Sequence, residues 1–325
     1  MPGEKAVKIG IYGPLSTAGA ASGMETCSEG PGCARLVGMC RIFGFRSVIQ
    51  SQVHSSLVSA DNALMRQSEF HPDGWGVAYY VAGSPHIIKT ATQALQSSLF
   101  KRVSGIVSSE TVLAHIRKAT QGEHTSINCH PFQYGRWVCA HNGDIPNFSA
   151  VGDKLRDRVA PILRRYILGD TDSEVIFYLF LTILSQHHEL HRQGTPLDAV
   201  VAALRETVRQ VREIADDADH RALLTLVVSN GELMAAHAGG KELLVSTHKS
   251  ECAERDGCPY HQVECEAPTK SGFVSHFVVS SEALQGSNVW RELTEGDVVA
   301  VDFHMRYHEY LTEESKAGIL VASAA

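Results

Sequence analysis

Short runs of apolar residues bounded by polar segments dominate the chain between about residues 40 and 140. These runs are rich in Val, Ile, Phe and Tyr, and such composition in short segments predicts β-strands. The sequence therefore predicts early strands at 42–45, 76–81, 112–116 and 137–140.

The pattern becomes helical after residue 170. Asp172 and Ser173 provide a polar start for a helix over 174–184, and apolar residues recur at helical spacing over 197–215. Asn230 and Gly231 then indicate a hairpin turn. Further strands are predicted at 222–228, 233–238, 243–246, 273–280 and 297–303. Strands, then helices, then strands are typical of a layered α+β fold rather than a strictly alternating one.

Composition sets the broad class of the protein. The chain has 325 residues, 44% of them hydrophobic, and a net charge of −7, which suits a soluble protein with a sizeable core. It contains no apolar run long enough to span a membrane, and its basic residues are scattered. We therefore expect a cytoplasmic protein that binds neither nucleic acid nor a membrane.

The first 39 residues differ from the rest, because they are rich in Gly, Ala and Ser and lack a secretory apolar segment. They are expected to form a leader, either an upstream region that the cell does not translate or a propeptide that is removed. We expect one domain over residues 40–310 and a C-terminal tail over 311–325.

The eight cysteines are not spaced like a disulfide framework, which fits a reducing compartment. Four residues, Cys252, Cys258, His261 and Cys265, could form a tetrahedral zinc site. Their spacing is irregular for such a module, and Gly257 and Pro259 equally indicate a polar loop that contains cysteines. We favour the loop, and we expect no metal ion in the active site and no cofactor.

Cys40 directly follows Met39, so removal of that methionine would make it a free amino-terminal cysteine. Such a residue carries a thiol nucleophile and an α-amine base together, since an α-amine with a pKa of about 7.7–8.0 can accept the thiol proton near neutral pH. A buried structural cysteine is the alternative interpretation of this segment taken alone.

Two further segments place polar groups beside predicted strands. Arg117 and Thr120 follow the strand at 112–116, where a guanidinium can bind a carboxylate through two hydrogen bonds. Asn142 and Gly143 offer a side-chain amide and an unhindered backbone N–H, and two such donors can form an oxyanion hole.

Together with the acidic segment at Asp172, these motifs resemble, in this order, class II glutamine amidotransferase domains of the N-terminal-nucleophile hydrolases. The resemblance implies a four-layer αββα sandwich. It implies Cys40 as nucleophile and Asn142 and Gly143 as the oxyanion hole. The residues implied for substrate binding are Arg117, Thr120, Asp172 and His130.

The segment that contains Asp73 and Trp75 looks like the stand-alone, YafJ-like branch of this family, and the resemblance implies that these positions help to seal the substrate pocket or gate an ammonia tunnel. The implied reaction is hydrolysis of a γ-glutamyl amide through a γ-glutamyl thioester, with a separate synthase subunit as a potential partner. Three alternatives remain open: glutamine as substrate, another γ-glutamyl compound, or a catalytically silent protein that binds γ-glutamyl ligands.

Overall fold

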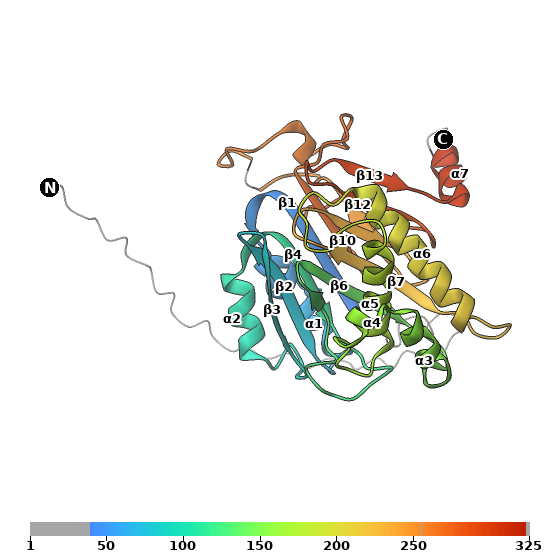
Figure 1. The fold of residues 1–325 in the computed structure, drawn as a ribbon. Helices are drawn as coiled ribbons and strands as arrows, with labels where there is room; N and C mark the ends of the chain where they lie inside the picture. Colours follow the sequence, from blue (N-terminus) through green and yellow to red (C-terminus); the bar gives the residue numbers. More distant parts are fainter. Residues whose placement is uncertain (1–39, 254, 323–325) are drawn as a thin grey trace, which may run out of the picture. The chain divides into compact units, whose positions relative to one another are not determined.

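Two antiparallel β-sheets form the centre of the unit Gly38–Ala325 (Figure 1). The structure is a computed structural model that describes residues 40–253 and 255–322, so the predicted leader lies outside the described residues. The larger sheet contains, in spatial order, β11 (Arg291–Glu292), β9 (Leu244–Ser246), β10 (His276–Ser280), β1 (Arg41–Gln52), β4 (Ser108–Ile116), β2 (Trp75–Val81) and β3 (Ser84–Thr90). The smaller sheet contains β13 (Tyr307–Tyr310), β12 (Val298–Val301), β8 (Met234–His237), β7 (Leu223–Ser229), β6 (Trp137–Asp144) and β5 (Phe132–Tyr134).

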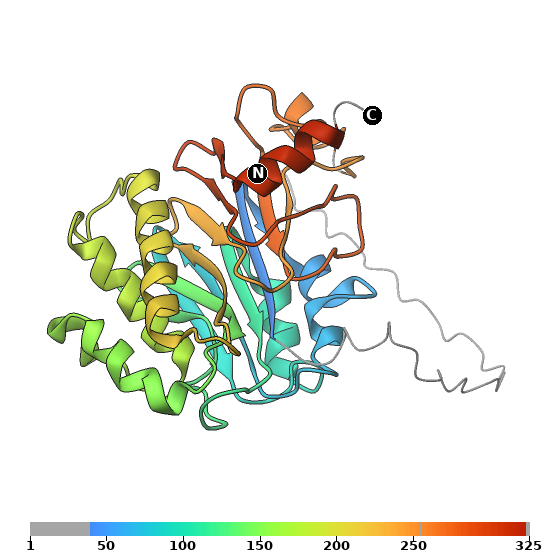
Figure 2. The same cartoon turned by 90° about the vertical axis from the view of Figure 1, so that its right-hand side faces the viewer.

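Helices cover the outer face of each sheet, as Figure 2 shows in side view. A π-helical turn (Ser55–Ser59), α1 (Leu64–Gln67) and α2 (Ser98–Ile106) lie on the larger sheet. The smaller sheet is covered by α3 (Phe148–Arg158), α4 (Pro161–Arg164), α5 (Asp172–Ser185) and α6 (Leu197–Ala215). A short 3₁₀ turn (Val263–Cys265) and α7 (Glu313–Ala322) complete the described elements. The four-layer αββα arrangement implied by the sequence is confirmed.

Three hydrophobic clusters correspond to the three interfaces between these layers. Along β1, Ile42 points into the cluster between the sheets and Phe43 into the cluster beneath α2. This alternation is the expected consequence of a strand that is buried on both faces. Because both faces of β1 are packed, its register is strongly fixed, and so is the position of the residue that precedes it.

The strands and helices predicted from apolar runs are present; most ends differ by a few residues, whereas the strand predicted at 42–45 continues to Gln52 as β1. The helix predicted at 174–184 begins two residues earlier, because Thr171 and not Asp172 is its N-cap and accepts a hydrogen bond from the Glu174 N–H. The turn at Asn230 and Gly231 joins β7 to β8 as predicted. The residues predicted as a C-terminal tail contain α7.

The sequence patterns did not predict β3 or α3. Strand β3 is an edge strand that contains Pro85 and His86, and its side chains are partly or fully exposed, so it lacks an apolar run.

Among the described residues, no helix combines the length and the apolar character that crossing a membrane requires.

Candidate active site

Antiparallel pairing of β1 with β4 brings the start of one strand to the end of the other. Arg41 pairs with Ile116, so Cys40 lies beside the two residues that follow β4. The Cys40 thiol donates a hydrogen bond to the Lys118 carbonyl oxygen (3.2 Å), and the Lys118 N–H lies 3.3 Å from the same sulfur atom. Both contacts come from the backbone, so the position of the sulfur depends on the sheet and not on a flexible side chain.

Burial raises the pKa of the Cys40 thiol to about 11, and the Lys118 N–H together with the Arg117 charge offsets only part of this effect. The thiol is therefore protonated at neutral pH in the intact chain. A protonated thiol is a poor nucleophile, so this cysteine needs a base before it can react.

The end of β6 supplies the two predicted oxyanion-hole residues. Gly143 is required by its surroundings, because a Cβ atom there would lie 1.7 Å from the Leu223 carbonyl oxygen on β7 and 2.4 Å from His141 Nε2. Asn142 follows Val138 and Ala140 in the row of β6 residues that faces the other sheet. It is buried beside Ser281, the residue that follows β10.

Asp172 lies in the first turn of α5 and is almost fully buried. One carboxylate oxygen accepts hydrogen bonds from the Ser173 N–H (2.7 Å) and hydroxyl (3.1 Å), and the other accepts from the Ile145 N–H (2.9 Å). Burial raises the pKa of Asp172, and the nearby His141 side chain together with the Ile145 N–H offsets only part of this effect. A cationic group that entered the pocket would relieve this cost.

Arg117 is a buried cation that lines the same pocket as Asp172. Its buried guanidinium donates to the carbonyl oxygens of Gln121 (2.8 Å), Gly122 (3.4 Å) and Glu123 (3.3 Å). No carboxylate in the described part of the chain forms an ion pair with it. The three carbonyls fix the orientation of the guanidinium and leave its charge available to an anion.

These groups meet in one small cavity with a volume of about 20 Å³. Six of the nine predicted site residues line it: Cys40, Arg117, Thr120, His130, Gly143 and Asp172. The pocket thus combines a thiol, a cation and a buried carboxylate, which is the set of groups needed to bind an amino-acid end and attack a carbonyl nearby.

His130 lies in the pocket wall with both ring nitrogens unpartnered, and its ring packs on His115 at a centroid distance of 4.1 Å. Burial lowers the pKa values of both histidines, to about 3 for His115. Both rings are therefore neutral at physiological pH and do not add positive charge beside Cys40.

Asn142, Asp73 and Trp75 are not among the residues that line this pocket. The Asp73 carboxylate instead accepts a hydrogen bond from the Ala119 N–H (2.8 Å) and forms an ion pair with His124 (3.2 Å), so it holds the loop that carries Thr120. Trp75 is fully buried and packs edge-on against Phe100 of α2. Its position is that of a core residue.

Sequence reasoning did not assign a role to His141, although it lies in the same motif as Asn142. His141 Nε2 lies 2.9 Å from the Leu223 carbonyl and must carry a proton, since a carbonyl only accepts. Its Nδ1 lies 2.8 Å from the Ser173 hydroxyl, whose single proton can be donated either to this nitrogen or to the Asp172 carboxylate. His141 thereby connects β6 and β7 to the start of α5, which carries Asp172.

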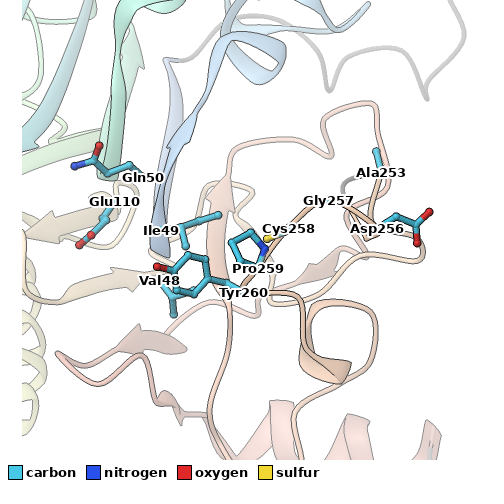
Figure 3. Close-up of a pocket in the computed structure, with 10 residues that line it drawn as sticks. All are labelled: Val48, Ile49, Gln50, Glu110, Ala253, Asp256, Gly257, Cys258, Pro259 and Tyr260. Carbon is cyan, nitrogen blue, oxygen red and sulfur yellow. The ribbon is translucent and has the colours of Figure 1, made fainter. Parts of the chain in front are cut away.

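A larger pocket of about 740 Å³ lies elsewhere and contains none of the predicted site residues. In Figure 3, Val48 and Ile49 of β1 lie close to Pro259 and Tyr260 of the loop between β9 and β10. That loop also carries the four residues considered as zinc ligands: Cys252, Cys258, His261 and Cys265. In the part of the chain that the structure describes, no group of three or more His, Cys, Asp or Glu side chains is arranged to hold a metal ion.

Comparison with known proteins agrees with this geometry. The family model described as "Glutamine amidotransferases class-II" matches residues 39–306. The chain belongs to the class II glutamine amidotransferases. This match begins one residue before Cys40 and ends within the last strands of the described fold.

Relatives of this amidotransferase chain include proteins from yeast and bacteria. It is 31% identical over 165 residues to "Probable glutamine amidotransferase DUG3" of Saccharomyces cerevisiae, which is 46% of each chain. It is 27% identical over 172 residues to "Putative glutamine amidotransferase YafJ" of Escherichia coli, which is 51% of this chain and 60% of YafJ. The chain therefore aligns with about half of each of these two relatives.

Solved structures support the fold. A protein described as "glutamine aminotransferase class-II domain protein" from Silicibacter pomeroyi aligns with a TM-score of 0.53 at 20% identity, over 83% of this chain and 98% of that one. The glutamine phosphoribosylpyrophosphate amidotransferase of Bacillus subtilis aligns with a TM-score of 0.53 at 13% identity, over 84% of this amidotransferase chain and 49% of the other.

Proposed function

We propose that this protein hydrolyses the γ-amide of glutamine, with Cys40 as an amino-terminal nucleophile. The observation that carries the proposal is the pocket in which the Cys40 thiol, the Arg117 guanidinium and the Asp172 carboxylate meet. A free amino acid carries both charges at one end. The cation of the pocket matches the α-carboxylate of glutamine, and the buried carboxylate matches its α-ammonium.

In the proposed reaction, the Cys40 thiolate adds to the γ-carbonyl carbon and forms a tetrahedral intermediate. The Asn142 side-chain amide and the Gly143 N–H stabilise its oxyanion, and each such donor contributes about 3–4 kcal/mol to transition states of this kind. The carbon–nitrogen bond then breaks, ammonia leaves with the proton held by the α-amine, and a γ-glutamyl thioester remains. Water activated by the same amine hydrolyses the thioester to glutamate and free thiol.

The reaction requires that Cys40 be the first residue of the mature chain. While residue 39 is attached, the nitrogen of Cys40 belongs to a peptide bond and cannot act as a base. The thiol pKa of about 11 in the intact chain leads to the same conclusion, because almost none of the thiol is ionised at neutral pH. Removal of Met39 supplies the base.

The released ammonia has two potential fates, hydrolytic release or transfer to an acceptor on a separate synthase subunit. A cytoplasmic location fits both fates, since glutamine and its ammonia acceptors are metabolites. The amino-acid end of the substrate is specified by Arg117 and Asp172, whereas the leaving group is not, so a larger γ-glutamyl amide is the second candidate substrate.

The first test is the intact mass of the protein expressed from its own gene, before and after incubation with 6-diazo-5-oxo-L-norleucine. This glutamine analogue alkylates nucleophiles of this type. We expect a chain that begins at Cys40 and gains one adduct on that residue. The Cys40→Ala variant should gain none, whereas Cys139→Ala, which alters a buried core cysteine, should react like the wild type.

Ammonia and amine assays then separate the substrates. Glutamine should release ammonia and glutamate in equal amounts, and a γ-glutamyl peptide would release glutamate and a free amine. A Cys40→Ala protein with full turnover, or a stable chain that starts at residue 1 and gains no adduct, would contradict the proposal.

A further inference from the structure

Asn142 and Ser281 form a contact between the two sheets, next to the strand that follows the nucleophile. Asn142 belongs to β6 of the smaller sheet, and Ser281 follows β10 of the larger sheet. Their side chains approach to 3.3 Å between Asn142 Nδ2 and Ser281 Oγ. Both residues are almost fully buried, so water cannot replace either partner easily.

Ser281 is also attached to the strand that carries the nucleophile. Its Oγ accepts a hydrogen bond from the Ile42 N–H (3.0 Å), and its N–H donates to the Ile42 carbonyl (3.1 Å). Ile42 lies two residues after Cys40. The Ser281 hydroxyl is therefore fixed to the same backbone segment that places the thiol.

One buried polar atom of this contact lacks a hydrogen bond. With Nδ2 turned toward Ser281, the Asn142 Oδ1 atom is buried and has no partner. The oxygen and nitrogen of an amide side chain are nearly the same size, and their assignment follows from the hydrogen-bond network. A hydroxyl has one proton and two acceptor sites, and the Ile42 N–H occupies only one acceptor site of Ser281.

We propose that Ser281 is a positioning residue that donates its hydroxyl proton to Asn142 Oδ1 and thereby presents Asn142 Nδ2 to the substrate oxyanion. A 180° rotation of the amide satisfies the buried oxygen at once. It leaves Nδ2 with a proton free to donate in the empty site, which is the state an oxyanion hole needs before substrate arrives. The opposite orientation would present a carbonyl oxygen and repel the developing negative charge.

This proposal rests on the proposed function, because it assigns the orientation of an oxyanion-hole donor. It also explains why the donor is a side chain at an interface between sheets. Asn142 belongs to one sheet and the thiol to the other, so a group attached to the thiol's sheet must set the angle of the amide. Ser281 is attached to that sheet through both of its bonds to Ile42.

A kinetic test compares Ser281→Ala, Asn142→Ala and the double variant in the mature protein, with glutamine as substrate. Loss of a whole donor lowers kcat by about 10²–10³-fold, and we expect loss of its orientation to lower kcat by about 10- to 100-fold with KM changed less than about twofold. The double variant should be no slower than Asn142→Ala alone, because the hydroxyl then has nothing to orient.

Ser280→Ala is the matched control, since Ser280 is an equally buried serine one residue earlier whose hydroxyl makes no bond to Asn142. It should leave kcat unchanged. A wild-type kcat for Ser281→Ala, or losses that multiply in the double variant, would overturn the proposal. Multiplying losses are what a merely structural serine would give.

A second measurement does not depend on turnover. In the isotopically labelled wild-type protein, the Asn142 side-chain amide protons should show no nuclear Overhauser effects to the Ser281 Hβ protons, because the amide oxygen faces Ser281. Strong effects between these protons would overturn the orientation even if Ser281→Ala failed to fold. If the wild type neither turned over glutamine nor reacted with the analogue, the proposed function would fail, and the Overhauser effects would still decide the orientation.

Discussion

Replacement of Asp172 by Asn separates the charge of this residue from its shape. Asn keeps the size of the side chain and can retain one oxygen that accepts the Ser173 N–H (2.7 Å) and hydroxyl (3.1 Å). Its amide nitrogen then faces the Ile145 N–H, which loses its acceptor. An unsatisfied buried donor costs about 1–3 kcal/mol.

A second effect acts in the opposite direction. Burial raises the pKa of Asp172, so the stability that this carboxyl contributes is present at low pH, where it is neutral, and is lost as the pH rises through its folded-state pKa. Wherever the carboxyl is ionised in the empty site, it carries the cost of a buried charge, which Asn removes. We expect the free energy of unfolding to change by less than about 2 kcal/mol in urea titrations at pH 7.

Substrate capture should change more. A hydrogen bond between the substrate ammonium and the carboxylate contributes about 1.5–3 kcal/mol, so kcat/KM for glutamine should fall by about 10- to 150-fold. The decisive comparison uses glutaramate, which is glutamine without its α-amino group. Its kcat/KM should be nearly the same in wild type and in Asp172→Asn, since the lost partner is absent from the substrate.

An equal loss for both substrates would refute the reasoning, because it would show that Asp172 acts through the structure of the pocket and not through the ammonium. Asp153→Asn is a suitable control. Asp153 lies on α3 with its side chain 96% exposed, so its replacement should change neither stability nor kcat/KM.

The remaining predictions concern the steric space at Gly143 and the protonation of Cys40 and of two buried histidines. Gly143→Ala places a methyl group against the Leu223 carbonyl, so kcat/KM should fall by about 10²-fold or more and the melting temperature should drop, measured by ammonia release and calorimetry. In the intact chain the Cys40 thiol, with a pKa of about 11, should react with iodoacetamide about tenfold faster for each unit of pH between 7 and 10, and removal of Met39 should accelerate the reaction at pH 7. Burial lowers the pKa values of His71 to about 4 and of His115 to about 3, so the stability that both contribute is present above pH 6.5 and is lost as the pH falls toward these values. Each should steepen acid unfolding by up to about 1.4 kcal/mol per pH unit, and His71→Gln should reduce that slope.

Much of the site could be predicted because its residues follow directly from strand ends. Arg117 comes after an apolar run, and antiparallel pairing alone then brings it to the start of the strand that follows Cys40. Gly143 could be predicted as a position of close approach, although the sequence did not show that the approaching atom is the Leu223 carbonyl.

For other residues, tertiary packing sets positions that the local sequence does not show. Trp75 and Asp73 are separated by one residue, yet one packs on Phe100 in the core and the other holds the loop at Ala119. The local sequence pattern does not show which face of β2 packs against α2, because both faces of this strand are buried. The role of His141 depended on Ser173, a partner distant in sequence and invisible to periodicity.

The residues of the site lie on two different sheets, and this determines which parts of its geometry a mutation can change. The position of the Cys40 thiol depends on the register of β1 with β4, that of Asn142 and Gly143 on the register of β6 with β7, and that of Arg117 on the loop after β4. Packed sheets cannot slip by a single residue without turning every side chain to the other face, so the two halves of the site keep their own geometry. What can change is the distance and angle between the sheets. Direct contacts across that interface beside the nucleophile, above all Asn142 with Ser281, should therefore control the rate more strongly than their small contribution to stability suggests.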